Sequence, residues 1–179
     1  MRIIAGSRKG ATIYAPKHTD TRPTGDRVRE AAFNLIGPVD DASVLDLYAG
    51  SGAMGLEALS RGAASAVFIE ADREACRTIQ RNLVKLKLEG AQVVCKDALT
   101  ALAQEASTGR RYDLVLVDPP YAMYSDLQMR LAAYLPSVLA EDGLLVVETA
   151  SGEEPELPLP KRTSRRYGSA RLTLFEPSA

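Results

Sequence analysis

Short, almost wholly apolar segments alternate along this chain with segments of helical periodicity. The apolar segments are residues 43–50, 66–71, 91–98, 112–120 and 143–148, and the helical segments between them are 52–62, 72–88, 99–107 and 125–139. Strands that are apolar on both faces are typical of a parallel sheet covered by helices on both sides. The alternation therefore predicts an α/β domain of the doubly wound, Rossmann-like type.

Additional segments flank this pattern at each end. Residues 2–5 and 11–14 surround a glycine-bounded turn and predict a small hairpin, and residues 24–37 predict a helix that Thr24 caps and Gly37 ends. Near the C-terminus, 162–176 predicts two antiparallel strands that turn at Gly168. We expect one domain over 1–179, with 1–37 as an N-terminal extension and 38–179 as the catalytic core.

Composition excludes several classes of protein. The two cysteines, Cys76 and Cys95, have neither the spacing of a disulfide framework nor that of a zinc site, so we expect no metal and a reducing cytoplasm. The longest aliphatic runs have four residues, which is too short for a membrane span or a signal peptide.

Charge is distributed unevenly, although its sum is −1. Residues 1–36 hold seven basic and three acidic residues, and residues 157–175 hold five basic residues and no acid. Basic ends on an acidic body indicate a polyanion bound at one face. An ordinary solvated surface explains the same counts equally well.

A glycine-rich loop follows the first strand of the alternating pattern. Gly50, Gly52 and Gly55 form G-x-G-x-x-G between a strand and a helix, which is typical of a nucleotide-like ligand bound at a helix N-terminus. Glu70, at the end of the next strand, is placed to accept the hydroxyl groups of a ribose. Asp46, ahead of the glycines, would repel a pyrophosphate but suits an ammonium group, so the pattern favours S-adenosylmethionine over NAD.

Each of these residues also has a purely structural interpretation. The glycines can serve a tight turn, and Asp46 and Glu70 can serve as helix-associated acids; their joint spacing favours the cofactor. Asp97, at the end of the third strand, either contacts the adenine or caps the next helix.

The fourth strand ends in "DPPY", Asp118 to Tyr121. Prolines cannot donate to a sheet ladder, so the strand ends there with a stiff backbone, a carboxylate and an aromatic ring together. The Asp118 carboxylate and the Pro119 carbonyl can accept the two N–H groups of an amino group on a base, which aims the nitrogen lone pair at a methyl donor. Pro120 stiffens the turn, and Tyr121 offers a ring for the base to stack on.

A strand-ending turn is the alternative interpretation of "DPPY". Tyr124 is a second stacking candidate, although an aromatic residue at a helix start can equally pack inward. His18, the only histidine, lies in a polar loop and is expected at the surface.

At these residues the sequence resembles the class I S-adenosylmethionine-dependent methyltransferases. The segments "RIIAGSRKG", "TRPTGDRVREAAFNLI", "DLYAGSGAMGLEALSRGA", "DPPY" and "RYGSARLTLF" extend the resemblance to the bacterial family that methylates the exocyclic N2 of one guanine in 16S ribosomal RNA. It implies a seven-stranded, mostly parallel methyltransferase sheet with an antiparallel C-terminal hairpin and a small N-terminal hairpin and helix.

The resemblance also implies partners and site residues. The substrate would be 16S rRNA within the small ribosomal subunit or an assembly intermediate, and a monomer is expected to act on it. Asp46, Gly50, Gly52, Glu70 and Asp97 would bind the cofactor, and Asp118, Pro119, Pro120 and Tyr121 would hold the guanine. The basic residues that would contact RNA are Arg8, Lys9, Arg22, Arg27 and Arg29, although a solvated or self-paired helix face explains the arginines of 22–29 equally well.

Other functions stay open at this stage. An amino-methyltransferase could act on adenine N6 of DNA or RNA, or on a protein glutamine. An NAD-dependent oxidoreductase would need a hydride-site acid or base and usually a second domain, and neither is visible in the sequence. A catalytically silent RNA-binding module is the third alternative.

Overall fold

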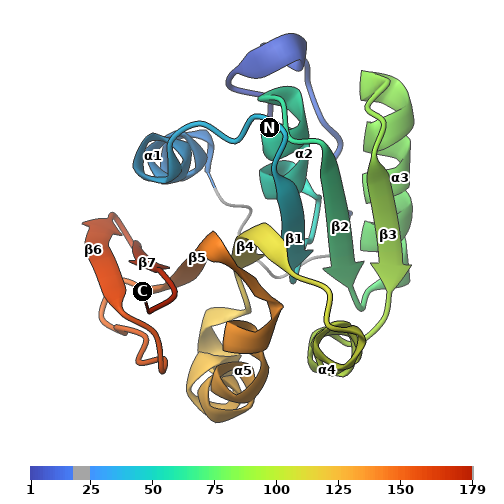
Figure 1. The fold of residues 1–179 in the computed structure, drawn as a ribbon. Coiled ribbons are helices and arrows are strands. Elements are labelled where there is room, and N and C mark those ends of the chain that lie inside the picture. Colours follow the sequence, from blue (N-terminus) through green and yellow to red (C-terminus); the bar gives the residue numbers. More distant parts are fainter. Residues whose placement is uncertain (18–24, 179) are drawn as a thin grey trace.

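The computed structural model describes residues 1–17 and 25–178, and its centre is a single sheet of seven strands (Figure 1). The strand order is β3-β2-β1-β4-β5-β7-β6. The strands are β1 (Ser43–Leu47), β2 (Ser65–Glu70), β3 (Ala91–Cys95), β4 (Tyr112–Val117), β5 (Leu139–Ala150), β6 (Lys161–Tyr167) and β7 (Ala170–Phe175). The first five are parallel, and β7 is antiparallel to both β5 and β6. The predicted sheet and C-terminal hairpin are confirmed.

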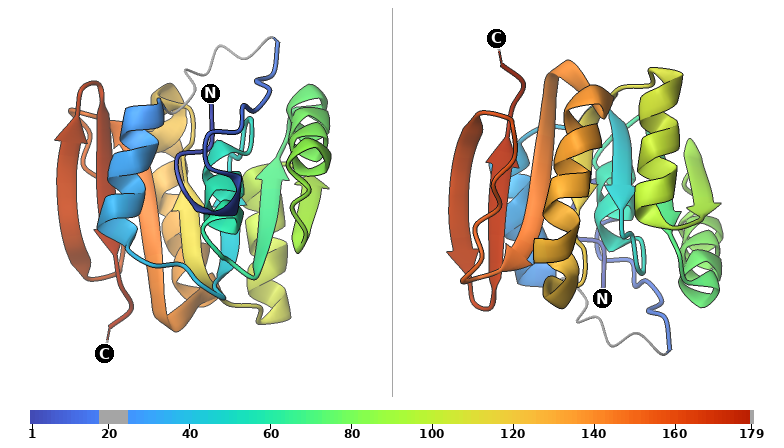
Figure 2. Two further views of the ribbon diagram at one scale, coloured as in Figure 1. Left: turned by 90° about the horizontal axis from the view of Figure 1, so that it is seen from above. Right: turned by 90° about the horizontal axis from the view of Figure 1, so that it is seen from below.

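Helices cover both faces of this sheet, because successive strand side chains point to opposite faces and both sets are apolar (Figure 2). One core lies under α1 (Asp26–Ile36), α2 (Ala53–Ser60) and α3 (Arg73–Leu86). The other lies under α4 (Ala98–Thr108) and α5 (Tyr124–Val138). Val44 belongs to the first core and its neighbour Leu45 to the second.

The N-terminal segment has the form of the predicted small hairpin. Its two extended stretches are joined by one antiparallel bridge, Arg2 to Thr12, around the 3-10 turn η1 (Gly6–Arg8). The turn packs so closely on the end of α2 that a Cβ atom at Gly6 would lie 1.8 Å from the Ser60 carbonyl oxygen. Only glycine fits this approach, and its φ of +81° also favours glycine.

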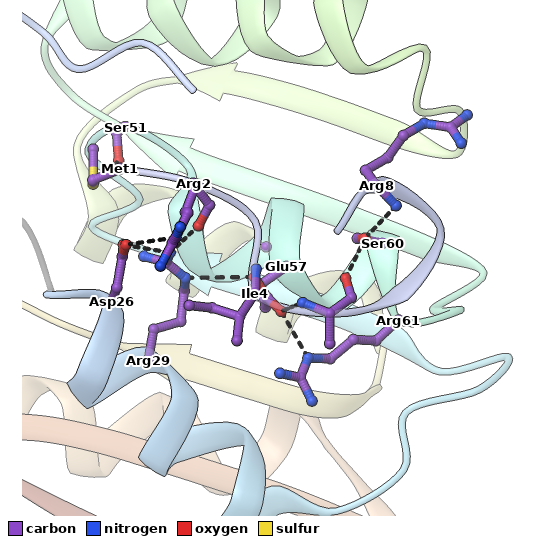
Figure 3. A network of polar contacts seen from close by, with 12 residues as sticks. Met1, Arg2, Ile4, Arg8, Asp26, Arg29, Ser51, Glu57, Ser60 and Arg61 are labelled. Atoms are coloured by element: carbon purple, nitrogen blue, oxygen red, sulfur yellow. Dashed lines mark hydrogen bonds and ion pairs between the residues drawn. The ribbon is translucent and has the colours of Figure 1, made fainter. Parts of the chain in front are cut away.

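A buried carboxylate on α2 holds the N-terminal segment in place (Figure 3). The Glu57 side chain is fully buried and accepts the backbone N–H groups of Ile4, at 2.8 Å, and Ala5, at 2.9 Å. It also pairs with the guanidinium groups of Arg61, at 2.8 Å, and Arg29, at 3.5 Å. One side chain thus joins the N-terminal segment, α1 and α2.

The parallel strands also determine where a ligand can bind. The carboxyl ends of β1 to β5 meet at one edge of the sheet, and the loops that follow them carry the glycines, Glu70, Asp97 and "DPPY". Open α/β sheets bind their ligands at this edge, close to the point where the strand order reverses. Here that point lies between β1 and β4.

Candidate active site

The glycine loop between β1 and α2 turns sharply and leaves its outer side open. Gly50 has a φ of +55° and Gly52 a φ of +79°, values that favour glycine. A Cβ atom at Gly50 would meet no atom within 4 Å, whereas one at Gly55 would lie 2.4 Å from the Phe68 ring. Gly55 therefore allows α2 to pack on β2, and Gly50 leaves open space beside its backbone.

Glu70 joins this loop to the end of β2. One carboxylate oxygen accepts the Gly50 backbone N–H and the other accepts the Asp72 backbone N–H, both at 2.8 Å. A carboxylate has about four lone-pair sites, so these two bonds leave acceptor capacity for further donors. The side chain is half-buried, and the loop holds it in one orientation.

Asp46 is a buried carboxyl group beneath the same loop. Its Oδ2 atom accepts the Gly55 backbone N–H at 2.9 Å. Burial raises the pKa of Asp46 to about 7, the nearby Glu70 charge adds to the rise, and the Gly55 hydrogen bond lowers it. A cationic ligand group placed here would favour the ionised form.

Asp97 caps α4, which is one of the two roles expected for it from the sequence; the other is contact with the adenine. Its Oδ1 atom accepts both the backbone N–H and the hydroxyl of Thr100 at 2.9 Å, and these bonds lower the pKa of Asp97. Tyr48 lies near this carboxylate with a φ of +59°, which is uncommon for a bulky residue. Burial, and secondly the charge of Asp97, raise the pKa of Tyr48 to about 12.

The "DPPY" turn lies at the end of β4, between β1 and β5. The Asp118 backbone N–H donates to the Leu47 carbonyl at 3.4 Å, so the turn starts beside the end of β1. Asp118 and Tyr121 are half-buried and Pro119 is buried. The Pro120 carbonyl accepts the Met123 N–H at 2.9 Å, which begins the 3-10 turn η2 (Tyr121–Met123).

Glu148, which is not among the residues expected from the sequence, lies beside the "DPPY" turn. It is buried near the end of β5, and its Oε1 atom accepts the Tyr121 hydroxyl at 2.7 Å. Val117 and Val147 are paired in the sheet, so Glu148 and Asp118 follow neighbouring positions at the same edge. An acid that ends an apolar strand was the signal used for Asp118, and "LLVVE" carries the same signal.

Two of the predicted RNA-contacting residues, Arg8 and Arg29, have their side chains bound within the fold. The structure corrects the expectation for Arg29, whose side chain is fully buried and pairs with Asp26 at 2.9 Å and with Glu57. Arg8 is used at the other end of the sheet, where its guanidinium donates to the Leu86 and Lys87 carbonyls at the end of α3. Both arginines therefore stabilise the fold in this structure.

The remaining substrate candidates stay predictions. Lys9 is exposed beside Arg8, and Arg27 is exposed on the first turn of α1. Arg22, like His18 and Thr24, lies outside the described residues. Tyr124 packs inward and is 1% exposed, so it offers no ring to a base.

The part of the chain that the structure describes has neither a metal-binding cluster nor a membrane-spanning helix. Residues 1–17 and 25–178 contain no group of three or more His, Cys, Asp or Glu side chains that could hold a metal ion. Over the same ranges, no helix combines the length and the apolar character needed to cross a membrane.

The geometry can be compared with known proteins. Residues 1–176 match the model of a protein family described as Conserved hypothetical protein 95. Ribosomal RNA small subunit methyltransferase D of Escherichia coli is 48% identical over 122 residues, which cover 68% of this chain and 60% of that relative.

Solved structures share the fold. The structure of yhhF from Escherichia coli has a TM-score of 0.87 and 36% identity, with 100% of this chain and 98% of that one covered. The Thermus thermophilus 16S rRNA N2 G1207 methyltransferase RsmC, in complex with AdoMet and guanosine, has a TM-score of 0.68 at 21% identity over 90% of this chain and 45% of that one. The chain therefore belongs to the Conserved hypothetical protein 95 family, is a homologue of ribosomal RNA small subunit methyltransferase D, and has the fold of the class I methyltransferases.

Proposed function

We propose that this protein transfers a methyl group from S-adenosylmethionine to the exocyclic N2 of a guanine in 16S rRNA. One observation carries the proposal, the position of the "DPPY" turn. Asp118 is bonded to Leu47, at the end of the strand that leads into the glycine loop, and Tyr121 is bonded to the buried Glu148. A cofactor bound at the glycine loop and a planar amine held at "DPPY" would therefore lie side by side at one sheet edge.

The residues of the glycine loop fit S-adenosylmethionine, which is the cofactor. Gly50 leaves open space at the backbone, and Glu70 retains acceptor capacity for ribose hydroxyls. The buried Asp46 carboxyl suits the ammonium of the amino acid part, and the Asp97 carboxylate, at the end of β3, would accept the adenine amino group. The cofactor supplies an electrophilic methyl group on a sulfonium.

The chain mainly has to align the acceptor nitrogen. In the proposed step the N2 nitrogen forms a bond to the methyl carbon, the carbon–sulfur bond breaks, and one N–H proton leaves through Asp118 or water. The Asp118 carboxylate and the Pro119 carbonyl accept the two N–H groups and direct the lone pair at the methyl. Positioning of this kind can supply much of the barrier reduction in a direct displacement.

Tyr121 would stack on the guanine, and Glu148 would keep its ring in place. The bond of 2.7 Å between the Tyr121 hydroxyl and the Glu148 carboxylate limits rotation of the tyrosine. Stacking of a base on an aromatic side chain contributes about 1–3 kcal/mol. The base must leave its helix to reach this position.

RNA and guanine N2 are proposed as the substrate because of the relatives and because the segments from "RIIAGSRKG" to "RYGSARLTLF" resemble the guanine-N2 methyltransferase family. The Escherichia coli relative is named as a small-subunit rRNA methyltransferase, and its matched region covers most of this chain. "DPPY" by itself suits any planar amino group, so adenine N6 is the second candidate.

The test is transfer of radiolabelled methyl to undermethylated small ribosomal subunits, to their naked RNA and to duplex DNA, followed by nucleoside analysis. N2-methylguanosine from the subunits or their RNA is the expected product. Label in adenine would replace the guanine proposal with the second candidate, and the absence of label from all RNA would overturn it. In the same assay Asp118→Ala should lower kcat by at least about 100-fold, with cofactor affinity retained.

A further inference from the structure

A hollow on the outer face of α3 lies apart from the active site. It has a volume of about 580 Å³, and its lining residues are Tyr14, Arg77, Gln80, Arg81, Val84 and Lys85. Three of these six are cations and none is an acid. Val84 is 78% exposed within the hollow, so this helix face has an uncovered surface.

Tyr14 is held rigidly against α3 by its backbone. The buried Asn82 side chain accepts the Tyr14 N–H at 2.8 Å and donates to the Tyr14 carbonyl at 3.0 Å. The ring in turn lies under two cations, since Arg81 and Lys85 are each 4.5 Å from its centroid. The tyrosine thus positions two positive charges on one exposed surface.

These cations lack acidic partners within residues 1–17 and 25–178. No salt bridge in those ranges involves Arg77, Arg81 or Lys85, whereas Arg61 and Arg162 each pair with a glutamate. Gathering like charges without a counter-charge is unfavourable, and a bound polyanion would relieve that cost. The net charge of the chain is −1, so this cluster is a local concentration of positive charge.

The buried Asn82 side chain links Tyr14, at the hollow, to the glycine loop. Asn82 also donates to the carbonyl of Ser51, next to Gly50, at 3.2 Å. From Tyr14 the N-terminal segment continues beside α3 (Figures 1 and 2). The Lys17 N–H donates to Glu74 on the first turn of that helix at 3.2 Å. Because α3 begins three residues after Glu70, the cationic face extends towards the sheet edge that holds the active site.

We propose that this α3 face, made of Tyr14, Arg77, Arg81 and Lys85, binds the phosphate backbone of RNA beside the target nucleotide. The inference rests on the proposed function, because it assigns the place where the RNA substrate of that site is held. Arg77, Arg81 and Lys85 contact phosphates, and Tyr14 is a positioning residue that orients two of them.

Binding of naked 16S rRNA over a salt series tests the proposal directly. The triple variant Arg77→Gln/Arg81→Gln/Lys85→Gln should lower the slope of log affinity against log salt by about two to three and weaken binding at least about tenfold at low salt. Its KM for RNA should rise while kcat and cofactor affinity stay at the wild-type values. Tyr14→Leu should weaken RNA binding, and Tyr14→Phe, which keeps the ring, should restore it.

Arg110→Gln is the matched control, because Arg110 also lies over a tyrosine ring, 5.3 Å from the centroid of Tyr112, but at the opposite edge of the sheet. Its RNA affinity and salt slope should equal those of the wild type. If the triple variant kept the wild-type salt dependence of RNA affinity and the wild-type KM for RNA, the α3 face would be excluded as an RNA-binding surface. The proposed function would be unaffected by that result. If the wild type methylates no RNA but the triple variant still loses RNA affinity, the docking surface stands and the proposed function falls.

Discussion

Three carboxylates near the carboxyl ends of β1, β2 and β5 have three different environments. Asp46 is buried beneath the glycine loop, Glu70 is half-buried and bonded to two backbone N–H groups, and Glu148 is buried and bonded to a tyrosine. The same chemical group can therefore meet a cation, hydroxyl groups or an aromatic side chain, depending on its surroundings.

Cofactor affinity should depend on pH through Asp46. Its pKa of about 7 in the free protein means that a cationic ligand must stabilise the ionised form, so affinity should fall below about pH 7, approaching tenfold per pH unit. Calorimetric titration with S-adenosylmethionine at pH 6, 7 and 8 measures this dependence. Asp46→Asn should bind more weakly with a flat profile, and an unchanged slope in that variant would exclude Asp46 as the cause.

The same shift predicts the effect of Asp46 on folding. The folded pKa lies above the ordinary value of 3.8, so the folded state holds the proton more tightly than the unfolded chain. In the absence of cofactor, the contribution of this group to the free energy of unfolding therefore falls as pH rises from about 4 to about 7.

The bond between Tyr121 and Glu148 should affect catalysis through ring position. Tyr121→Phe keeps the ring but loses the hydroxyl, and we expect a fall of about tenfold in kcat/KM for RNA; Tyr121→Ala also loses stacking and should fall further. Glu148→Gln keeps an oxygen acceptor and should retain most of the activity that Glu148→Ala loses. Tyr134→Phe, at an exposed tyrosine of α5, is the control, and equal activity of Glu148→Ala and wild type would contradict the role.

At the scale of elements, Glu57 joins three parts of the chain that are distant in sequence. Because Arg29 is fully buried, Glu57→Ala would leave its charge with less compensation, and we expect the free energy of unfolding to fall by about 3–5 kcal/mol. Urea denaturation measures this loss. Glu176→Ala, which removes the half-exposed pair with Arg162, should cost less than about 1 kcal/mol. If the two variants lost similar free energies of unfolding, the Glu57 contacts would contribute no more to stability than an exposed ion pair.

At the scale of the whole molecule, the proposed cofactor site combines residues from several strand ends, so ligand binding should stabilise the entire fold. S-adenosylmethionine at 100 times its Kd should add about 2.7 kcal/mol, which corresponds to a rise of about 5–10 °C in Tm for a domain of this size. Glu70→Ala should lose most of this shift at the same ligand concentration, whereas the exposed Glu89→Ala should keep it. An undiminished shift in Glu70→Ala would exclude that residue from the cofactor site.

Local pattern was sufficient to predict most elements of the sheet. The apolar runs and their helical partners gave the parallel strands, and the turn at Gly168 gave the antiparallel hairpin. The place where the N-terminal hairpin packs was not predictable, because it depends on Glu57 and on the close approach of Gly6 to α2, more than 50 residues away.

The sequence by itself determined the fold class and the glycine loop, and it placed "DPPY" at a strand end, since these follow from periodicity and from the conformational limits of glycine and proline. Only the tertiary structure decided how individual charges are used. Arginine looks the same in a sequence whether it meets RNA, caps a helix as Arg8 does, or neutralises a buried acid as Arg29 does. Burial and distance separate these uses, because the strength of a charge interaction depends on the surrounding solvent and on partners brought together by folding.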